Sequence, residues 1–169
     1  MNFKEIDIKS LSFNPFTLIG DEWMLISAGE ESKFNTMTAS WGGVGVLWKK
    51  PVTFCFVRPQ RYTFEFMENN DYYSLSFFDP DMKPALSFCG TNSGKDVDKI
   101  KATGLIPKFD AQAPYFEQAK TVFICRKLYN QFILPDLFLD ASIEKDVYPQ
   151  KDYHRVYVGE IVKVLKKDD

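Results

Sequence analysis

The sequence offers few of the residues from which a metal site or a dithiol centre is built. Its 169 residues include one histidine, His154, and three cysteines that lie far apart, Cys55, Cys89 and Cys125. No Cys-x-x-Cys pair is present, which argues against a structural zinc site and a dithiol redox motif. Cys55 and Cys125 lie in apolar runs, so we expect both to be buried, inert thiols. We therefore expect no metal.

The chain also lacks a charge excess of one sign and a long apolar run. It has 21 basic and 23 acidic residues, a formal charge of −2, which gives no electrostatic basis for binding nucleic acid. No stretch approaches the ~18 apolar residues of a membrane span. The first residues show no signal-peptide pattern. These absences predict a cytoplasmic protein that binds neither a membrane nor nucleic acid.

No internal repeat, low-complexity segment or linker divides the chain, and we expect one domain over residues 1–169. Aromatic residues make up 16% of the sequence, with 16 Phe, eight Tyr and three Trp. This share favours β-structure, where Phe and Tyr pack well on pleated surfaces. It fits a surface covered by a partner or a planar ligand, and it fits equally a core rich in Phe.

Hydrophobic periodicity predicts many strands and a few helices. Gly42, Gly43 and Gly45 are expected to interrupt the second strand, as at a bulge. The pattern indicates a mainly β domain with inserted helices, arranged as a closed or partly closed antiparallel barrel. The expected strands are 22–28, 34–41, 51–57, 72–78, 120–129 and 153–164, and the expected helices are 61–68, 81–88 and 95–102.

The first candidate binding segment is 36–43, which contains Thr38, Ala39, Ser40 and Trp41. Small residues at a strand edge let a ligand reach main-chain N–H and C=O groups, and an indole can form a wall against a planar ring. The alternative is a turn in which the glycines supply positive φ and Trp41 belongs to the core.

The second candidate segment is 58–63, between a buried strand and the start of a helix. A helix N-terminus suits a phosphate, and the arginines and hydroxyl of this segment would add donors: Arg58, Arg61 and Thr63. The alternative is that Thr63 caps the helix while the arginines pair with surface carboxylates.

Two further positions carry weaker signals. Ser93 and Gly94 lie in a loop that could face a cofactor, although Ser93 and Asp96 also fit a capping box for the helix that follows. His154 stands at the start of the last strand, where it is either a structural hydrogen bonder or a proton donor near a ligand. For Cys89 a packing role at a helix end is the simpler expectation.

Taken in this order, the segments resemble the flavin reductase-like family, whose members have the FMN-binding split-barrel fold, a Greek-key-like antiparallel barrel. The likeness is greatest to its flavoredoxin-like branch, and it extends from about residue 34 to residue 161. The stretches that carry it are 35–43, 50–52, 58–63, 89–100, 103–105 and 153–161.

The resemblance implies a homodimer with FMN at the subunit interface. It implies that NADH or NADPH reduces the flavin, or that FMN transfers electrons to a redox partner protein. Since no Gly-x-Gly-x-x-Gly fingerprint is present, a nicotinamide cofactor would bind against the flavin without a Rossmann domain. A non-enzymatic FMN-binding protein of the same fold is the alternative. A pyridoxamine-phosphate-oxidase-like enzyme shares the architecture, but the motif order here follows the flavoredoxin branch.

The resemblance also implies roles for individual residues. The isoalloxazine ring would be lined by Thr38, Ala39, Ser40 and Trp41. The ribityl phosphate would be held by Arg58, Arg61, Tyr62 and Thr63, and Ser93 with Gly94 would close the site. His154 corresponds to the family's histidine near the final strand.

Overall fold

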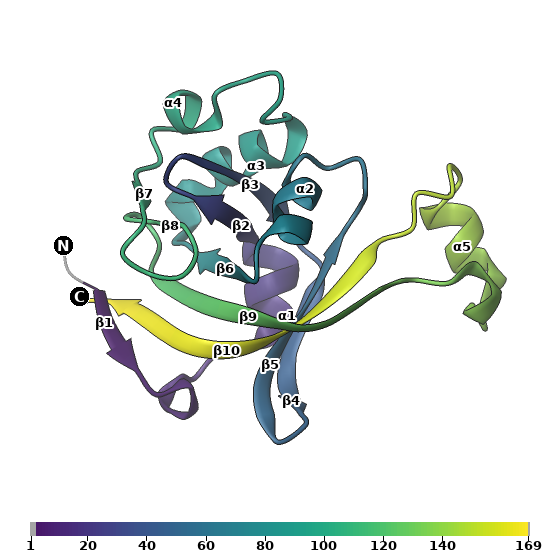
Figure 1. Cartoon of the computed structure of the whole chain (residues 1–169), viewed down its shortest axis with the longest axis horizontal. Helices are drawn as coiled ribbons and strands as arrows, with labels where there is room; N and C mark the ends of the chain where they lie inside the picture. The colour runs from purple at the N-terminus through teal and green to yellow at the C-terminus, as the bar shows by residue number, and fades with distance from the viewer. Residues whose placement is uncertain (1–2, 169) are drawn as a thin grey trace.

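Eight strands pair into one antiparallel sheet, and helices are inserted between them (Figure 1). The computed structural model describes residues 3–168. The sheet contains β1 (Phe3–Ile6), β2 (Met24–Glu30), β3 (Lys33–Ala39), β4 (Gly42–Leu47), β5 (Lys50–Val57), β6 (Tyr72–Phe77), β9 (Thr121–Phe132) and β10 (Arg155–Lys167). A separate pair is formed by β7 (Pro107–Lys108) and β8 (Tyr115–Phe116).

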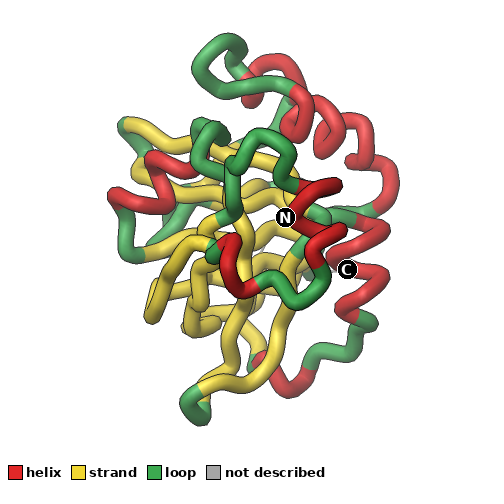
Figure 2. The backbone as a smooth tube through the Cα atoms, turned by 90° about the vertical axis from the view of Figure 1, so that its right-hand side faces the viewer, coloured by secondary structure: helices red, strands yellow, loops and turns green. Residues whose placement is uncertain are grey.

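The helices are short and gather mostly on one side of the strands (Figure 2). They are α1 (Pro15–Thr17), α2 (Thr63–Asn69), α3 (Lys83–Thr91), α4 (Lys99–Thr103) and α5 (Ala141–Val147). A π-helical turn at Leu18–Glu22 follows α1, and 3₁₀ turns occupy Ile8–Ser10, Pro80–Met82 and Pro135–Leu137. None of the helices within residues 3–168 is long and apolar enough to cross a membrane.

The strand order is β3-β2-β6-β9-β10-β5-β4. β10 makes the most pairings in the sheet, because it pairs with β9 along most of its length, with β5 through its first half and with β1 through its last four residues. Among the described strands no pairing joins β3 to β4, so the hydrogen-bonded path is open there. The predicted mainly β fold with inserted helices is confirmed, with the sheet open between these two strands.

The sheet buries side chains on both faces. In β2, Met24 and Ile26 point into one buried cluster and Leu25 into another, as the alternation of a strand requires. β9 repeats the pattern with Phe123 in the first cluster and Ile124 in the second. The second cluster also contains residues of α3 and β8, which cover that face. Both faces of the central strands are therefore core, which explains their continuous apolar runs.

Two features of the expected secondary structure are wrong. The glycine-rich stretch that was expected to interrupt a strand forms β4. The expected helix 95–102 is only α4, whose N-cap is Asp98, with a side chain that accepts from the Lys101 N–H at 3.0 Å. Ser93 accepts from the Lys95 N–H at 3.2 Å, within a turn, and forms no capping box. The helix therefore begins after Asp98, which caps it, and not after Ser93.

The three cysteines are free and buried, as predicted for Cys55 and Cys125, and Cys89 lies near the end of α3. Burial raises the pKa of Cys55 to about 12, and it also raises the pKa of Cys125. A thiol with a raised pKa holds its proton at neutral pH and is a poor nucleophile. Cys55 and Cys125 are therefore inert core residues.

A polar contact crosses the core beneath β10. The Tyr73 hydroxyl of β6 lies 2.6 Å from the Thr53 hydroxyl of β5, and both side chains are buried. In β10 the residue opposite Thr53 is Gly159. A Cβ at Gly159 would lie 2.2 Å from the Tyr73 hydroxyl oxygen, so only glycine leaves room for the phenol to pass.

We expect Gly159→Ala to lower the free energy of unfolding by about 1–3 kcal/mol, because the added methyl group overpacks the core against Tyr73. Gly20→Ala is the matched control, since no atom lies within 4 Å of a Cβ built there. Urea unfolding of both variants measures the difference. Equal stability of the two variants would contradict the assigned contact.

Candidate functional site

The pairing of β4 with β5 sets one wall of a pocket. Gly42 lies opposite Cys55 at the start of β4, so the preceding residue, Trp41, lies beside Phe56. Both Trp41 and Phe56 line the pocket, and the Trp41 side chain is 51% exposed. Trp41 is therefore a pocket wall and not the core residue of the alternative interpretation.

The pairing of β5 with β10 adds the charged wall. Val57 lies opposite Arg155, so the next residue of β5, Arg58, lies beside His154. Arg58 and Phe56 are two residues apart and share one face of their strand. The register of three neighbouring strands thus brings an indole, an imidazole and a guanidinium together from distant parts of the chain.

The pocket has a volume of about 240 Å³. Its lining includes seven residues predicted from the sequence, namely Thr38, Ala39, Ser40, Trp41, Arg58, Arg61 and His154. Three further residues, Met37, Phe56 and Gly90, complete it.

Arg58 is held by the segment that connects β9 to β10. Its guanidinium donates to the Asp152 carboxylate and to the Val147 carbonyl at 3.0 Å, and it lies 5.1 Å from the centre of the Tyr148 ring. The hydrogen bond from Arg58 is the main reason that the pKa of Asp152 is lowered. The positive charge of Arg58 is therefore balanced within the protein.

Arg61 is the second arginine that lines the pocket, and it differs from Arg58 in its partners. Its Nη1 donates to the Gly90 carbonyl at 2.8 Å, and among residues 3–168 no carboxylate forms an ion pair with it. Burial lowers the pKa of Arg61, but an arginine stays protonated in proteins. Half-buried at the pocket wall, Arg61 is suited to an anionic group of a ligand.

The end of β3 is fixed to α3 beside Arg61. The Thr38 hydroxyl donates to the Leu86 carbonyl. A Cβ at Gly90 would lie 3.3 Å from the Thr38 Cβ, so the two elements pack closely here. Residues 38–41 are therefore held at the pocket by a helix as well as by the sheet.

His154 is buried and neutral. Its ring centre lies 5.3 Å from that of Trp41, and its Nδ1 lies 2.8 Å from the Tyr148 hydroxyl. Burial is the main cause that lowers the pKa of His154 from 6.5 to about 4; the charge of Arg58 contributes in the same direction and that of Asp152 in the opposite one. The imidazole therefore serves the pocket as a neutral hydrogen-bonding group near pH 7.

The remaining predicted residues lie outside this pocket. Thr63 is fully buried and accepts from the Asn35 side-chain amide at 2.8 Å. It does not cap α2, whose N-cap residue is Tyr62 without a side-chain bond. Gly94 borders a neighbouring cavity of about 430 Å³, and Ser93 faces its own turn.

Lys99 is a buried cation whose position the sequence did not indicate. It is buried, and its ammonium group donates to the carbonyls of Thr36 at 2.8 Å and Cys89 at 2.9 Å. Burial lowers its pKa to about 8. Since a lysine in a short helix ordinarily faces solvent, nothing in the sequence marked it. It joins β3 to the end of α3 and so supports the pocket from behind.

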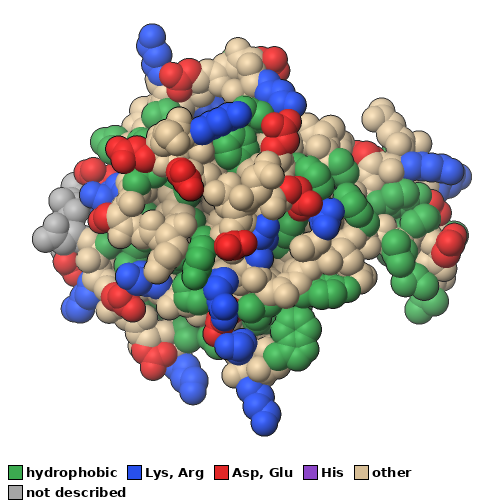
Figure 3. Space-filling model, viewed as in Figure 1, with side chains coloured by type: hydrophobic (Ala, Val, Ile, Leu, Met, Phe, Trp, Pro, Cys, Tyr) green, Lys and Arg blue, Asp and Glu red, His purple; other side chains and the backbone are tan. Residues whose placement is uncertain are grey.

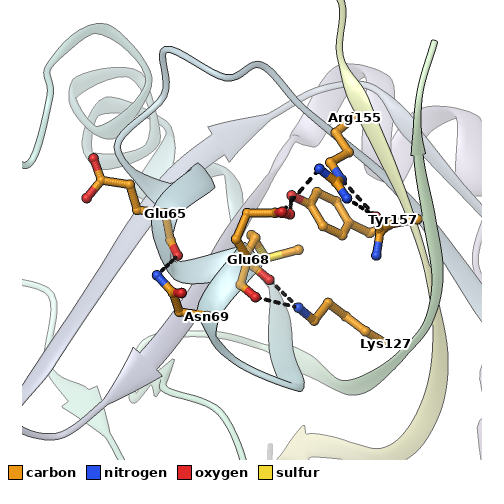
Figure 4. Close-up of polar contacts among 8 residues, drawn as sticks. Glu65, Glu68, Asn69, Lys127, Arg155 and Tyr157 are labelled. Carbon is orange, nitrogen blue, oxygen red and sulfur yellow. Dashed lines mark hydrogen bonds and ion pairs between the residues drawn. The ribbon is translucent and has the colours of Figure 1, made fainter. Parts of the chain in front are cut away.

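A second set of polar contacts ties α2 to the sheet, and with it the segment that carries Arg61 (Figure 4). The Glu68 carboxylate accepts from the Tyr157 hydroxyl at 2.5 Å and pairs with Arg155 at 3.1 Å. Lys127 of β9 donates to the Met67 and Glu68 carbonyls at the end of the helix. These bonds fix the end of α2 against β9 and β10.

The neutral state of His154 predicts a pH-dependent stability. Its folded pKa of about 4 is below the ordinary value of 6.5, so the unfolded chain binds a proton first as the pH falls. The free energy of unfolding should therefore fall between pH 6.5 and 4, by about 3 kcal/mol in total from this group. In His154→Gln this contribution is absent, so the stability gap between variant and wild type should narrow over that range. Urea unfolding at several pH values measures the gap, and a constant gap would contradict a buried, neutral imidazole.

Solved structures with the same fold come from several microorganisms. A flavoredoxin from Methanosarcina acetivorans is 21% identical, with a TM-score of 0.68 over 98% of this chain and 76% of its own. A candidate flavin reductase with a split barrel domain from Shewanella frigidimarina is 18% identical, with a TM-score of 0.68 over 100% and 81%. An NADH:FAD oxidoreductase from Streptomyces globisporus is 14% identical, with a TM-score of 0.64 over 86% and 74%. These similarities identify the fold as that of FMN-binding split-barrel proteins.

The sequence comparisons are consistent with this result. No curated protein sequence matches the chain significantly. The profile of the flavin reductase like domain matches residues 18–169, which is nearly the whole chain and includes every residue of the pocket. The chain therefore belongs to the flavin reductase like domain family.

Proposed function

We propose that the chain binds FMN in the pocket between β3, β5 and β10 and acts as an oxidoreductase. It serves either as a flavin reductase that uses NADH or NADPH, or as a flavoredoxin-type electron transfer protein. One observation carries the proposal: the pocket combines a half-exposed indole and a neutral imidazole with Arg61, a cation without a carboxylate partner among residues 3–168. A planar ring that carries a phosphate group matches this set in shape and charge.

Different residues of the pocket are proposed to contact the flavin ring and the phosphate. Thr38, Ala39 and Ser40 offer the main chain of a strand end to the ring, and Trp41 offers its indole face. Arg61 holds the phosphate. Arg58 keeps the wall in place through its bonds to the segment before β10. The chemistry that bound FMN supplies is acceptance of hydride at N5, while the protein supplies orientation and electrostatics.

The similar fold of the Streptomyces globisporus protein supports a nicotinamide donor, because that protein is described as an NADH:FAD oxidoreductase in complex with NAD and FAD fragments. The expected location is the cytoplasm, where a protein keeps free thiols such as the three cysteines of this chain.

The proposal is tested by the colour of the purified protein and by its reaction with nicotinamide. The protein should bind added FMN with a shift of the flavin spectrum, and anaerobic NADH or NADPH should bleach the bound flavin. If neither NADH nor NADPH bleaches the bound flavin, the protein is not a flavin reductase, and it is either an electron carrier or a non-enzymatic FMN-binding protein. Failure to bind FMN in excess would overturn the proposal.

The role of Arg61 is tested by comparing FMN with riboflavin, which lacks the phosphate. In Arg61→Ala we expect the affinity for FMN to fall more than tenfold, by about 1.5–3 kcal/mol, because a charge-assisted hydrogen bond is lost. The affinity for riboflavin should change by less than about threefold. Arg126→Ala is the control, since Arg126 is exposed and pairs with Glu160 at 2.8 Å. An equal loss for both flavins would contradict the phosphate assignment.

We further propose that the protein is a homodimer with FMN at the subunit interface. The segment 133–154, here called the arm, connects β9 to β10 and extends away from the body with α5 at its end (Figure 1). Hydrophobic side chains are exposed on the arm (Figure 3). They include Leu134, Leu137, Leu139 and Ile143. The pocket's 240 Å³ is also below the roughly 300–1,000 Å³ typical of ligand sites. A second copy that covers the arm would bury these side chains and supply the missing walls.

We expect the wild-type protein to sediment as a dimer. The double variant Leu137→Glu/Leu139→Glu should sediment as a monomer and bind FMN more weakly, because it places charges in the interface. Ile106→Glu changes an exposed residue that directly precedes β7, and β7 and α5 lie at opposite ends of the molecule in Figure 1, so this variant should leave the dimer intact. A double variant that stays dimeric would show that the arm is not the interface.

A further inference from the structure

The arm contributes one aromatic side chain to the back of the pocket. Tyr148 follows α5 and is buried, although most of its neighbours in the arm are exposed. Its ring meets the His154 ring edge to face at 5.6 Å, and its hydroxyl lies 2.8 Å from His154 Nδ1. The Trp41 ring centre lies 5.3 Å from that of His154. The imidazole therefore lies close to both a residue of the arm and a residue of the pocket wall.

We propose that Tyr148 is a positioning residue that holds His154 in a single tautomer, with Nδ1 accepting from the Tyr148 hydroxyl and the Nε2–H directed to the pocket. His154 then presents a fixed donor to an acceptor atom of the ligand, such as a carbonyl oxygen of a flavin ring or of a nicotinamide carboxamide. The identity of this ligand rests on the proposed function, whereas the tautomer is a property of the protein alone.

The direction of the hydrogen bond follows from the partners of Tyr148. Burial raises the pKa of the Tyr148 phenol, and Arg58 opposes that rise. The phenol keeps its proton, and the partner found for its hydroxyl within residues 3–168 is His154 Nδ1. If Nδ1 carried a proton and donated it, the buried O–H would have no acceptor among these residues, so the O–H donates and Nδ1 accepts. A neutral imidazole that accepts at Nδ1 carries its proton on Nε2.

The charged groups around the imidazole favour the same neutral state. Arg58 lies over the Tyr148 ring at 5.1 Å and disfavours a second positive charge. Asp152 acts against it, but its carboxylate already accepts from Arg58 and from Gln60. The Val147 carbonyl accepts from Arg58 at 3.0 Å and holds the arm beside Tyr148. The tyrosine is thus placed by the same contacts that fix the arginine.

The experiment uses the fact that His154 is the only histidine in the chain. In ligand-free protein labelled with ¹⁵N, the imidazole nitrogens give a single set of signals. Wild type should show the Nε2–H tautomer, with Nδ1 unprotonated. Tyr148→Phe removes the donor but keeps the ring, and its spectrum should move toward a mixture of tautomers. The matched control is Tyr153→Phe, since the Tyr153 ring packs against that of Tyr148, with their centres 5.1 Å apart, while its hydroxyl donates to Glu144.

A second measurement connects the tautomer to the ligand. FMN affinity, or the rate at which NADH reduces bound FMN, should fall roughly 3- to 10-fold in Tyr148→Phe, the effect of one hydrogen bond. It should stay within about twofold of wild type in Tyr153→Phe. If the tautomer behaves as expected but no variant binds FMN, the proposed function fails and the positioning role stands.

Two results would overturn the positioning role. One is an Nδ1–H tautomer in wild type, which requires no variant to fold. The other is a Tyr148→Phe spectrum identical to that of wild type.

Discussion

The candidate site depends on the register of three neighbouring strands. Antiparallel pairing fixes which residues stand side by side, and a slip of one residue would turn every side chain to the opposite face. In this sheet the register places Trp41 beside Phe56 and Arg58 beside His154. Gly159 is compatible with this register, because its lack of a side chain lets the Tyr73 phenol pass beneath β10 and reach Thr53 of β5. Core packing and site geometry are thus set by the same strand.

The two arginines of the pocket, Arg58 and Arg61, differ in whether a carboxylate balances their charge. Arg58 is neutralised by Asp152 and joins the arm to the sheet, while Arg61 has no carboxylate partner among residues 3–168 and is the residue we propose for the anionic group of a ligand. An arginine that is already paired with a carboxylate gains little from a second anion, whereas an arginine without such a partner gains a charge-assisted hydrogen bond. The arm, the imidazole and the pocket wall meet at Arg58, so the surface assigned to the dimer and the site assigned to FMN are physically connected.

Much of this arrangement could be predicted from the sequence. Strand positions followed from alternation, and seven of the ten residues that line the pocket had been singled out by short motifs and their order along the chain. The sequence did not indicate which side chains pair with residues that are distant in sequence. Thr63 is bonded to Asn35 across 28 positions, and Arg58 to Asp152 across 94. No local sequence pattern indicates such a pair. The Thr63 hydroxyl and the Arg58 guanidinium were therefore both assigned to a phosphate, whereas in the structure each has a hydrogen-bond partner within the protein. The buried Lys99 was missed for the same reason, since its acceptors are main-chain carbonyls that the fold brings to it.

The central claim is that a single pocket, built by the register of β4, β5 and β10 together with the end of β3, receives a flavin phosphate. A crystal structure of the protein grown with FMN tests it most directly. The account predicts flavin density in this pocket, with the ring beside Trp41 and His154 and the phosphate beside Arg61. Flavin bound in a different cavity, or a phosphate far from Arg61, would contradict it.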